Sequence, residues 1–129
     1  MAHEGWIGID FDGTLAVYNG YISADHCGEP IRPMVELVRE FLAQGEEVRI
    51  FTARIYPINM CVRPEVDNLP ELGLFEALND AVTALKAIRA YCLTHFGVML
   101  AVTNVKDPGM KVLYDDRCRQ VESNTGFVK

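Results

Sequence analysis

Two aspartates stand one residue apart where an apolar stretch ends: WIGID runs to Asp10, and Asp12 is followed at once by Gly13 and Thr14. A carboxylate at the end of a buried strand loses hydration, and two neighbouring carboxylates also repel each other. A plain solvated turn would suit the Asp-Gly sequence. The alternative is a cation that neutralises both side chains.

Three other strand-like stretches also end in side chains that can do chemistry. EVRIFTA contains Thr52, VMLAVTNV is followed by Lys106, and KVLYDD ends in Asp115 and Asp116. In a parallel sheet the carboxyl ends of the strands share one edge, where ligands bind. Carboxylates that meet there without clustered His or Cys favour Mg²⁺. A lysine and a hydroxyl nearby would complete a site for a phosphoryl group, whose transfer needs charge neutralisation and positioning.

The spacing of Asp10 and Asp12 suits two linked roles in such a site. One aspartate could attack phosphorus and form an aspartyl-phosphate, which water later hydrolyses. A carboxyl two residues further on could protonate the leaving oxygen and then activate that water. The chemistry indicated is therefore phosphoryl transfer by covalent catalysis.

The segments that must position these residues alternate between strand and helix patterns. Strands are expected at 6–10, 47–53, 98–105 and 111–116, and helices from Pro33 to Gly45 and over 76–96. Continuous apolar strands between helices predict an α/β fold, a Rossmann-like three-layer α/β/α sandwich with a mostly parallel sheet, in one domain over residues 1–129. Residues 55–75 hold three prolines without a clear period, which predicts an irregular excursion that would serve as a partial lid.

The overall composition argues against several classes of protein. The 12 Lys and Arg stand against 18 Asp and Glu, and the net charge of −6 without a basic run argues against a general nucleic-acid or membrane-surface binder. No apolar run is long enough to cross a bilayer, and the start MAHEGWIGID lacks the features of a signal peptide. The four cysteines form no CxxC pair, so free reduced thiols and a cytoplasmic location are expected.

Four short motifs follow one another along nearly the whole chain: DFDGTL, IFTAR, TNVKDP and VLYDDR, between about residues 6 and 117. They resemble, in the right order, the four motifs of haloacid dehalogenase (HAD) superfamily phosphatases, of which DxDx(T/V) is the first. The chain looks most like the short members found in phage and bacterial genomes. The resemblance implies a HAD-like fold. Too few residues separate Leu15 from the first helix for a cap domain, so no separate cap is expected.

The resemblance implies a role for each of the four aspartates. Asp10 would be the nucleophile and a metal ligand, and Asp12 the general acid/base, with its backbone carbonyl on the metal. Asp115 would hold Mg²⁺ directly, and Asp116 directly or through water. An aspartate at position 12 is typical of members that hydrolyse phosphomonoesters or transfer the phosphoryl group. A helix N-cap and a surface ion pair with Arg117 form the structural alternative for Asp115 and Asp116.

The resemblance also implies which groups face the phosphoryl oxygens. Thr52 would hydrogen-bond them, and Lys106 would neutralise the charge of the nucleophile and the phosphoryl group. Lys111 competes for this role, but it enters its strand from the far end, whereas Lys106 follows the third strand directly. Arg54 is a candidate phosphate-binding residue, with a solvated surface position as the alternative.

The predicted function is a Mg²⁺-dependent phosphomonoester hydrolase that acts on a phosphorylated small molecule through an aspartyl-phosphate. A polynucleotide-end phosphatase is one alternative, because capless relatives often take large substrates, although the acidic charge weighs against it. A non-catalytic phosphate- or metal-binding regulatory module is the other. Receiver domains carry similar groups, but their acidic pair comes first and their lysine last, and Asp12 favours turnover. Three tyrosines near the expected site mouth are assigned to core or rim packing: Tyr18, Tyr21 and Tyr56.

Overall fold

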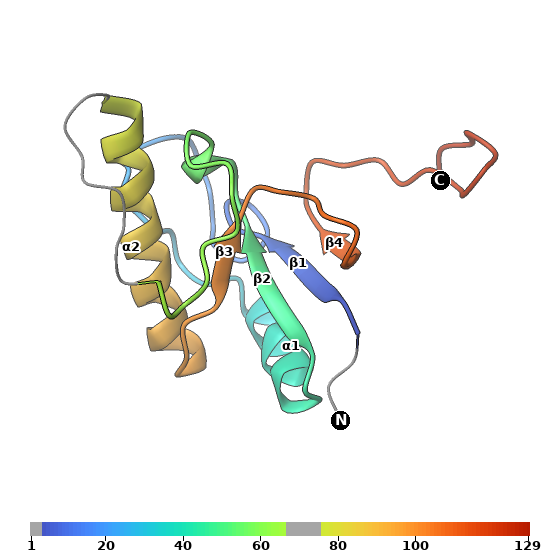
Figure 1. Ribbon diagram of the computed structural model, residues 1–129, viewed down its shortest axis with the longest axis horizontal. Helices are drawn as coiled ribbons and strands as arrows, with labels where there is room; N and C mark the ends of the chain where they lie inside the picture. The colour runs from blue at the N-terminus through green and yellow to red at the C-terminus, as the bar shows by residue number, and fades with distance from the viewer. Residues whose placement is uncertain (1–3, 67–75) are drawn as a thin grey trace.

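The structure is a computed structural model that describes residues 4–66 and 76–129 (Figure 1). Its elements, in chain order, are β1 (Trp6–Asp10), α1 (Arg32–Ala43), β2 (Glu47–Phe51), the 3₁₀ helix η1 (Ala53–Ile55), α2 (Glu76–Phe96), β3 (Ala101–Thr103) and β4 (Met110–Tyr114). Every strand and helix predicted from the sequence is present, with differences of a few residues at the ends.

The four strands form one parallel sheet in the order β3-β2-β1-β4. β1 lies inside the sheet and pairs with β2 on one side and β4 on the other. The predicted α/β fold with a mostly parallel sheet is confirmed, and the described residues form no separate domain. Because all four strands run in the same direction, their carboxyl ends lie at one edge.

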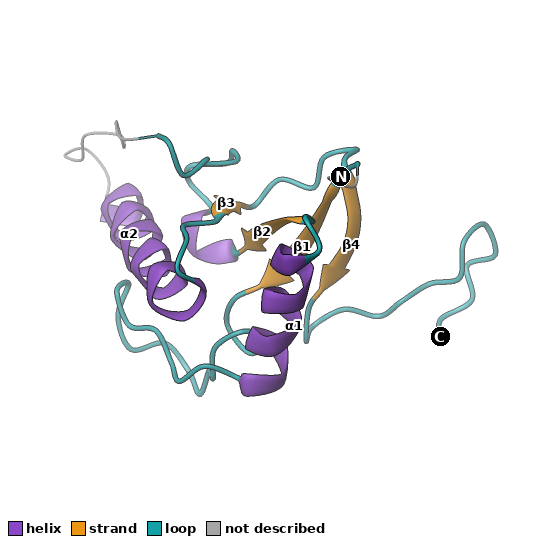
Figure 2. Ribbon diagram, turned by 90° about the horizontal axis from the view of Figure 1, so that it is seen from below, coloured by secondary structure: helices purple, strands orange, loops and turns teal. Residues whose placement is uncertain are grey.

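Both helices pack on the same face of the sheet (Figure 2). Ile7 and Ile9 of β1 belong to one buried cluster together with Val38 of α1 and Leu85 of α2. This cluster is the hydrophobic core of the molecule. Its position between β1 and the two helices keeps the central strand rigid where that strand delivers Asp10 to the edge.

The opposite face of the sheet carries no helix among the described residues. Trp6 and Arg49 lie there, with the guanidinium carbon 4.6 Å from the centre of the Trp6 ring. Trp6 Nε1 donates a hydrogen bond of 2.7 Å to Asp107. The sequence predicts a helical layer on each face, but the connection from β3 to β4 spans only residues 104–109, too few for a helical crossover. Asp107 of this short connection contacts Trp6 and Arg49 on the face where the third layer was expected.

The boundaries of α1 follow from its proline and glycine. Pro33 occupies the first turn, where its fixed φ suits a helix and its missing N–H costs nothing. The helix ends at Ala43, and Gly45 adopts a φ of +80°, a left-handed conformation that favours glycine after a helix. Val35 and Val38 are the buried residues of this helix.

The predicted lid segment, residues 55–75, lies only partly in the described chain. Within it, Val62 pairs with Val102 of β3 through two backbone hydrogen bonds of 2.7 and 3.0 Å. This part of the segment is therefore attached to the outer edge of the sheet. Residues 67–75 lie outside the described residues, so the lid stays a prediction.

Two expectations drawn from composition can be compared with the fold. In the described part of the chain, neither helix combines the length and the apolar composition that crossing a bilayer requires. The four cysteines are free thiols, as predicted: Cys27, Cys61, Cys92 and Cys118.

Candidate active site

Asp10 and Asp115 leave the sheet side by side. Their strands, β1 and β4, are neighbours, and Ile9 pairs with Tyr114. The next residue of each strand is an aspartate, so the two carboxylates emerge at the same level of the carboxyl edge. This register explains how side chains from opposite ends of the sequence meet.

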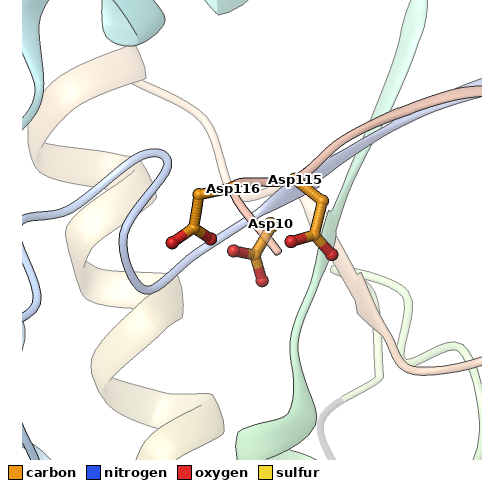
Figure 3. A group of neighbouring side chains, drawn as sticks. All are labelled: Asp10, Asp115 and Asp116. Atoms are coloured by element: carbon orange, nitrogen blue, oxygen red, sulfur yellow. The ribbon is translucent and has the colours of Figure 1, made fainter. Parts of the chain in front are cut away.

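Asp10, Asp115 and Asp116 form an acidic cluster (Figure 3). One ligand oxygen from each residue lies within 4.8 Å of the other two, and the three carboxylates gather on the same side of the strand ends. Burial, followed by the negative charge of Asp115, raises the pKa of Asp10 to about 7. The cluster thus offers hard oxygen donors that need a positive charge, with no His or Cys among them. Such a donor set fits Mg²⁺.

Thr14 and Gly13 hold the cluster together. The Thr14 hydroxyl lies 3.2 Å from Asp10 Oδ2 and 3.3 Å from Asp116 Oδ1, and it accepts the backbone N–H of Asp116 at 3.1 Å. Gly13 has a φ of +85°, and a Cβ there would lie 2.4 Å from Asp116 Oδ2. The sequence pattern assigns neither residue a role, because each also contacts Asp116, which only the fold brings close.

The carboxylate of Asp12 is not part of this cluster but pairs with Arg54. The guanidinium donates from Nε and Nη2 to the two carboxylate oxygens, each at 2.7 Å. It also donates to the backbone carbonyls of Ala24 and His26. The Arg54 side chain is only 15% exposed, so the alternative of a solvated surface arginine is wrong. The backbone contact of Asp12 with a metal and the contact of Arg54 with phosphate stay predictions.

Thr52 stands at the same edge, one residue after the end of β2. Phe51 pairs with Asp10, so Thr52 lies just beyond the level of Asp10. Its hydroxyl accepts the backbone N–H of Arg54 at 3.1 Å, which caps η1 and explains why the strand ends before the predicted residue 53. Among the described residues this hydroxyl donates to no side chain or carbonyl, so its proton can form a hydrogen bond to a ligand.

The two candidate lysines lie at different ends of the sheet. Lys111 belongs to β4 next to the start of β1, and its Nζ contacts Glu46 at 2.5 Å. This position excludes Lys111 from the acidic cluster. Lys106 follows β3 at the correct edge, and its side chain is exposed. The described residues show no contact between Lys106 and the aspartates, so its role stays a prediction.

A cavity of about 640 Å³ opens beside the cluster. Four candidate site residues are part of its lining: Asp10, Asp12, Thr52 and Asp116. Three tyrosines assigned to packing line the cavity instead, with exposed side chains: Tyr18, Tyr21 and Tyr56. Two further lining residues without an assigned site role are Asp80 and Arg117. Asp80 lies on α2, and nothing in the local sequence indicates that it lines the same cavity as Asp10.

The residues that follow Asp116 do not form the helix that the structural alternative requires, within the described chain. Asp115 Oδ1 instead accepts the backbone N–H of Arg117 at 2.8 Å. Asp115 therefore closes a short turn instead of capping a helix.

No protein-family model matches the chain, and no curated protein or solved structure matches it. The class that the fold and the site define is therefore a small α/β protein with a four-stranded parallel sheet and three carboxylates gathered at its carboxyl edge.

Proposed function

We propose that the protein is a Mg²⁺-dependent phosphomonoester hydrolase of the haloacid dehalogenase type, which acts through an aspartyl-phosphate on Asp10. The observation that carries the proposal is the acidic cluster, in which oxygens of Asp10, Asp115 and Asp116 lie within 4.8 Å of one another. Asp12 and Thr52 line the same cavity. Residues from the first, second and fourth motifs thus support one reaction centre.

The reaction has two halves. In the first, an oxygen of Asp10 attacks phosphorus while the bond from phosphorus to the leaving oxygen breaks, and Asp12 gives that oxygen its proton. The products are an alcohol and the aspartyl-phosphate. In the second, Asp12 takes a proton from water as the water oxygen attacks phosphorus. The bond to Asp10 then breaks, which releases inorganic phosphate and restores both aspartates.

The contacts around Asp12 imply a rearrangement in this cycle. Arg54 donates to both oxygens of Asp12, so one of these hydrogen bonds must be given up before that carboxyl can carry a proton. A phosphate group that draws Arg54 toward itself would release Asp12 at the moment it is needed. The Thr52 hydroxyl would meanwhile donate a hydrogen bond to a phosphoryl oxygen.

The cluster is the place where a divalent cation would bind. Asp10, Asp115 and Asp116 would hold it, and when bound it would supply positive charge against the carboxylates and the phosphoryl oxygens. Lys106 is the predicted further cation. Its exposed side chain has to turn toward the cluster for that purpose.

Hydrolysis of an aryl phosphate by the Asp10→Asn variant tests the proposal. We expect Mg²⁺-dependent release of phosphate by the wild-type protein and a loss of about 10³-fold or more in the variant, because no nucleophile remains. Asp25→Asn is the matched control, since Asp25 is exposed and hydrogen-bonds Ser23 rather than the cluster.

Full Mg²⁺-dependent activity in Asp10→Asn would contradict the proposal. A phosphorylated wild-type protein that keeps its phosphate for hours would instead favour the regulatory module. The lifetime of the phosphoprotein therefore separates an enzyme from a switch.

A further inference from the structure

The cavity beside the acidic cluster has walls from three separate elements. Tyr18 and Tyr21 belong to the segment between β1 and α1, and Tyr56 follows η1. The third wall is one face of α2, on which Ala77, Asp80 and Ala84 recur at helical spacing. The volume of about 640 Å³ lies within the range of about 300–1,000 Å³ usual for ligand sites.

The three tyrosines expose large aromatic surfaces at this cavity. Their exposed fractions are 46% for Tyr18, 70% for Tyr21 and 66% for Tyr56. Single exposed aromatics are ordinary, but three that converge on one cavity from two segments offer faces on which a planar ring can stack. Bases stack on such side chains with a gain that depends little on their identity.

The polar groups of the walls limit the ligand further. Asp80 offers a carboxylate, which accepts hydrogen bonds from hydroxyl or amino groups but donates none when ionised. The alanines and the faces of the tyrosine rings offer apolar surface, and the tyrosine hydroxyls add hydrogen-bond donors and acceptors at the ring edges. The cavity therefore suits a ligand that combines a flat aromatic part with a few hydrogen-bond donors better than a phosphate ester without an aromatic ring.

Arg54 ties one aromatic wall to the reaction centre. Its guanidinium joins Asp12 to the carbonyls of Ala24 and His26, which lie in the same segment as Tyr18 and Tyr21. Movement of this arginine toward a phosphate group would thus change its hydrogen bonds to the general acid and to the wall that contacts the rest of the substrate. The cavity and the acidic cluster act as one site.

We infer that the substrate is a nucleoside monophosphate, with its phosphate at Asp10 and its base between the tyrosines of the cavity. This inference rests on the proposed function. Asp80 accepts a hydrogen bond from the ribose or from an exocyclic amino group. The chain favours a free nucleotide over the end of a nucleic acid, because a polyanion would meet a protein of net charge −6.

Turnover of matched substrates tests the inference. We expect kcat/KM for a nucleoside monophosphate to exceed that for glycerol phosphate by at least about tenfold, as stacking of the base adds binding energy. Tyr21→Ala and Tyr56→Ala should each lower the ratio of kcat/KM for the nucleoside monophosphate to kcat/KM for glycerol phosphate by about tenfold. Phenylalanine at either position should restore the rate, because the ring and not the hydroxyl is used. Turnover of oligonucleotides with a terminal phosphate is measured as a third substrate, beside the nucleoside monophosphate and glycerol phosphate.

Binding to the inactive Asp10→Asn variant keeps this test separate from that of the proposed function. Calorimetric titration with a nucleoside monophosphate and Mg²⁺ should give an affinity that falls about tenfold in the double variants with Tyr21→Ala or Tyr56→Ala. Tyrosine-dependent binding without any hydrolysis by the wild type would overturn the phosphatase and keep the nucleotide site. Hydrolysis that is indifferent to both tyrosines, or that is faster on oligonucleotide ends, would overturn the nucleotide inference and keep the phosphatase.

Discussion

Gly13 controls how closely Asp116 can approach Asp10. It combines a left-handed φ of +85° with a contact that leaves no space for a Cβ, since that atom would lie 2.4 Å from Asp116 Oδ2. The DxDGT stretch therefore carries more than two carboxylates. Its glycine makes room for the third, and Thr14 ties that third residue to the first.

Gly13→Ala should weaken Mg²⁺ binding by about 10- to 100-fold, the usual effect of disturbing the surroundings of a metal ligand. Gly20→Ala is the control, because Gly20 also has a positive φ, +114°, but nothing lies within 4 Å of its Cβ position. Both variants should lose about 1–2 kcal/mol of stability to backbone strain. Calorimetric titration with Mg²⁺ separates them, and equal affinities in the two variants would show that Gly13 does not shape the cluster.

Asp12→Asn should affect substrates according to their leaving group. An alkyl phosphate needs a proton on its leaving oxygen, so its turnover should fall about 10²- to 10⁴-fold, the typical contribution of a general acid/base. Formation of the phosphoenzyme from an aryl phosphate should fall much less, because a phenolate leaves without that proton. A burst of leaving-group release, of phenol from the aryl phosphate and of the alcohol from the alkyl phosphate, measures this step. Equal losses for both substrates would contradict the assignment of Asp12 as the acid.

The residues that could be predicted from the sequence are those that end a strand. Asp10 and Asp115 each follow an apolar strand, so the parallel topology alone brings them to one edge. The pairing of Asp12 with Arg54 could not be predicted, because it depends on the turn of η1 after β2. The exposure of Tyr21 could not be predicted from the sequence either, because it depends on how a loop without periodicity folds.

At the scale of elements, periodic segments were predictable and connections were not. The helix over 76–96 coincides with α2, whereas the strand expected at 98–105 is reduced to Ala101–Thr103. The prediction of a third layer was wrong for a related reason. The connection from β3 to β4, residues 104–109, contains no helix that could cover the second face of the sheet. Asp107 fastens this connection to β1: it accepts hydrogen bonds from Trp6 Nε1 and from the backbone of Gly109.

The attachment of this segment should be visible as an acid transition. The Trp6 hydrogen bond, followed by other contacts, holds the pKa of Asp107 below its ordinary value of 3.8. The resulting stabilisation is complete above 3.8 and is lost as the pH falls through the lowered pKa. Trp6 is the only tryptophan, so its fluorescence should change in that lower range. Asp107→Asn keeps an acceptor but cannot titrate, and persistence of the transition in that variant would contradict the assignment.

At the scale of the whole molecule, the site is a local concentration of negative charge in a chain of net charge −6. The parallel sheet brings three carboxylates to one edge, and the core between β1 and the helices holds that edge in place. Like charges held at short range destabilise the fold unless a cation binds. Bound Mg²⁺ should therefore raise the stability of the fold, and the negative charge of Asp10 should lower it when no metal is bound.

Thermal unfolding measures this balance. Mg²⁺ at about 100 times its Kd should raise the free energy of unfolding of the wild-type protein by about 2.7 kcal/mol. In EDTA, at mildly alkaline pH, Asp10→Asn should unfold at a higher temperature than the wild type, because one charge of the cluster is gone. The same variant should gain little from Mg²⁺. A wild-type Tm that does not respond to Mg²⁺ would contradict the metal site.

The claim that Asp10 carries the phosphoryl group is tested most directly by chemical trapping. The Asp12→Asn protein is incubated with an aryl phosphate and Mg²⁺, quenched, and reduced with borohydride, which converts a phosphorylated aspartate to homoserine. We expect peptide mass spectrometry to find homoserine at position 10, only when Mg²⁺ is present. Homoserine at another position, or at none while phosphate is still released, would contradict the account.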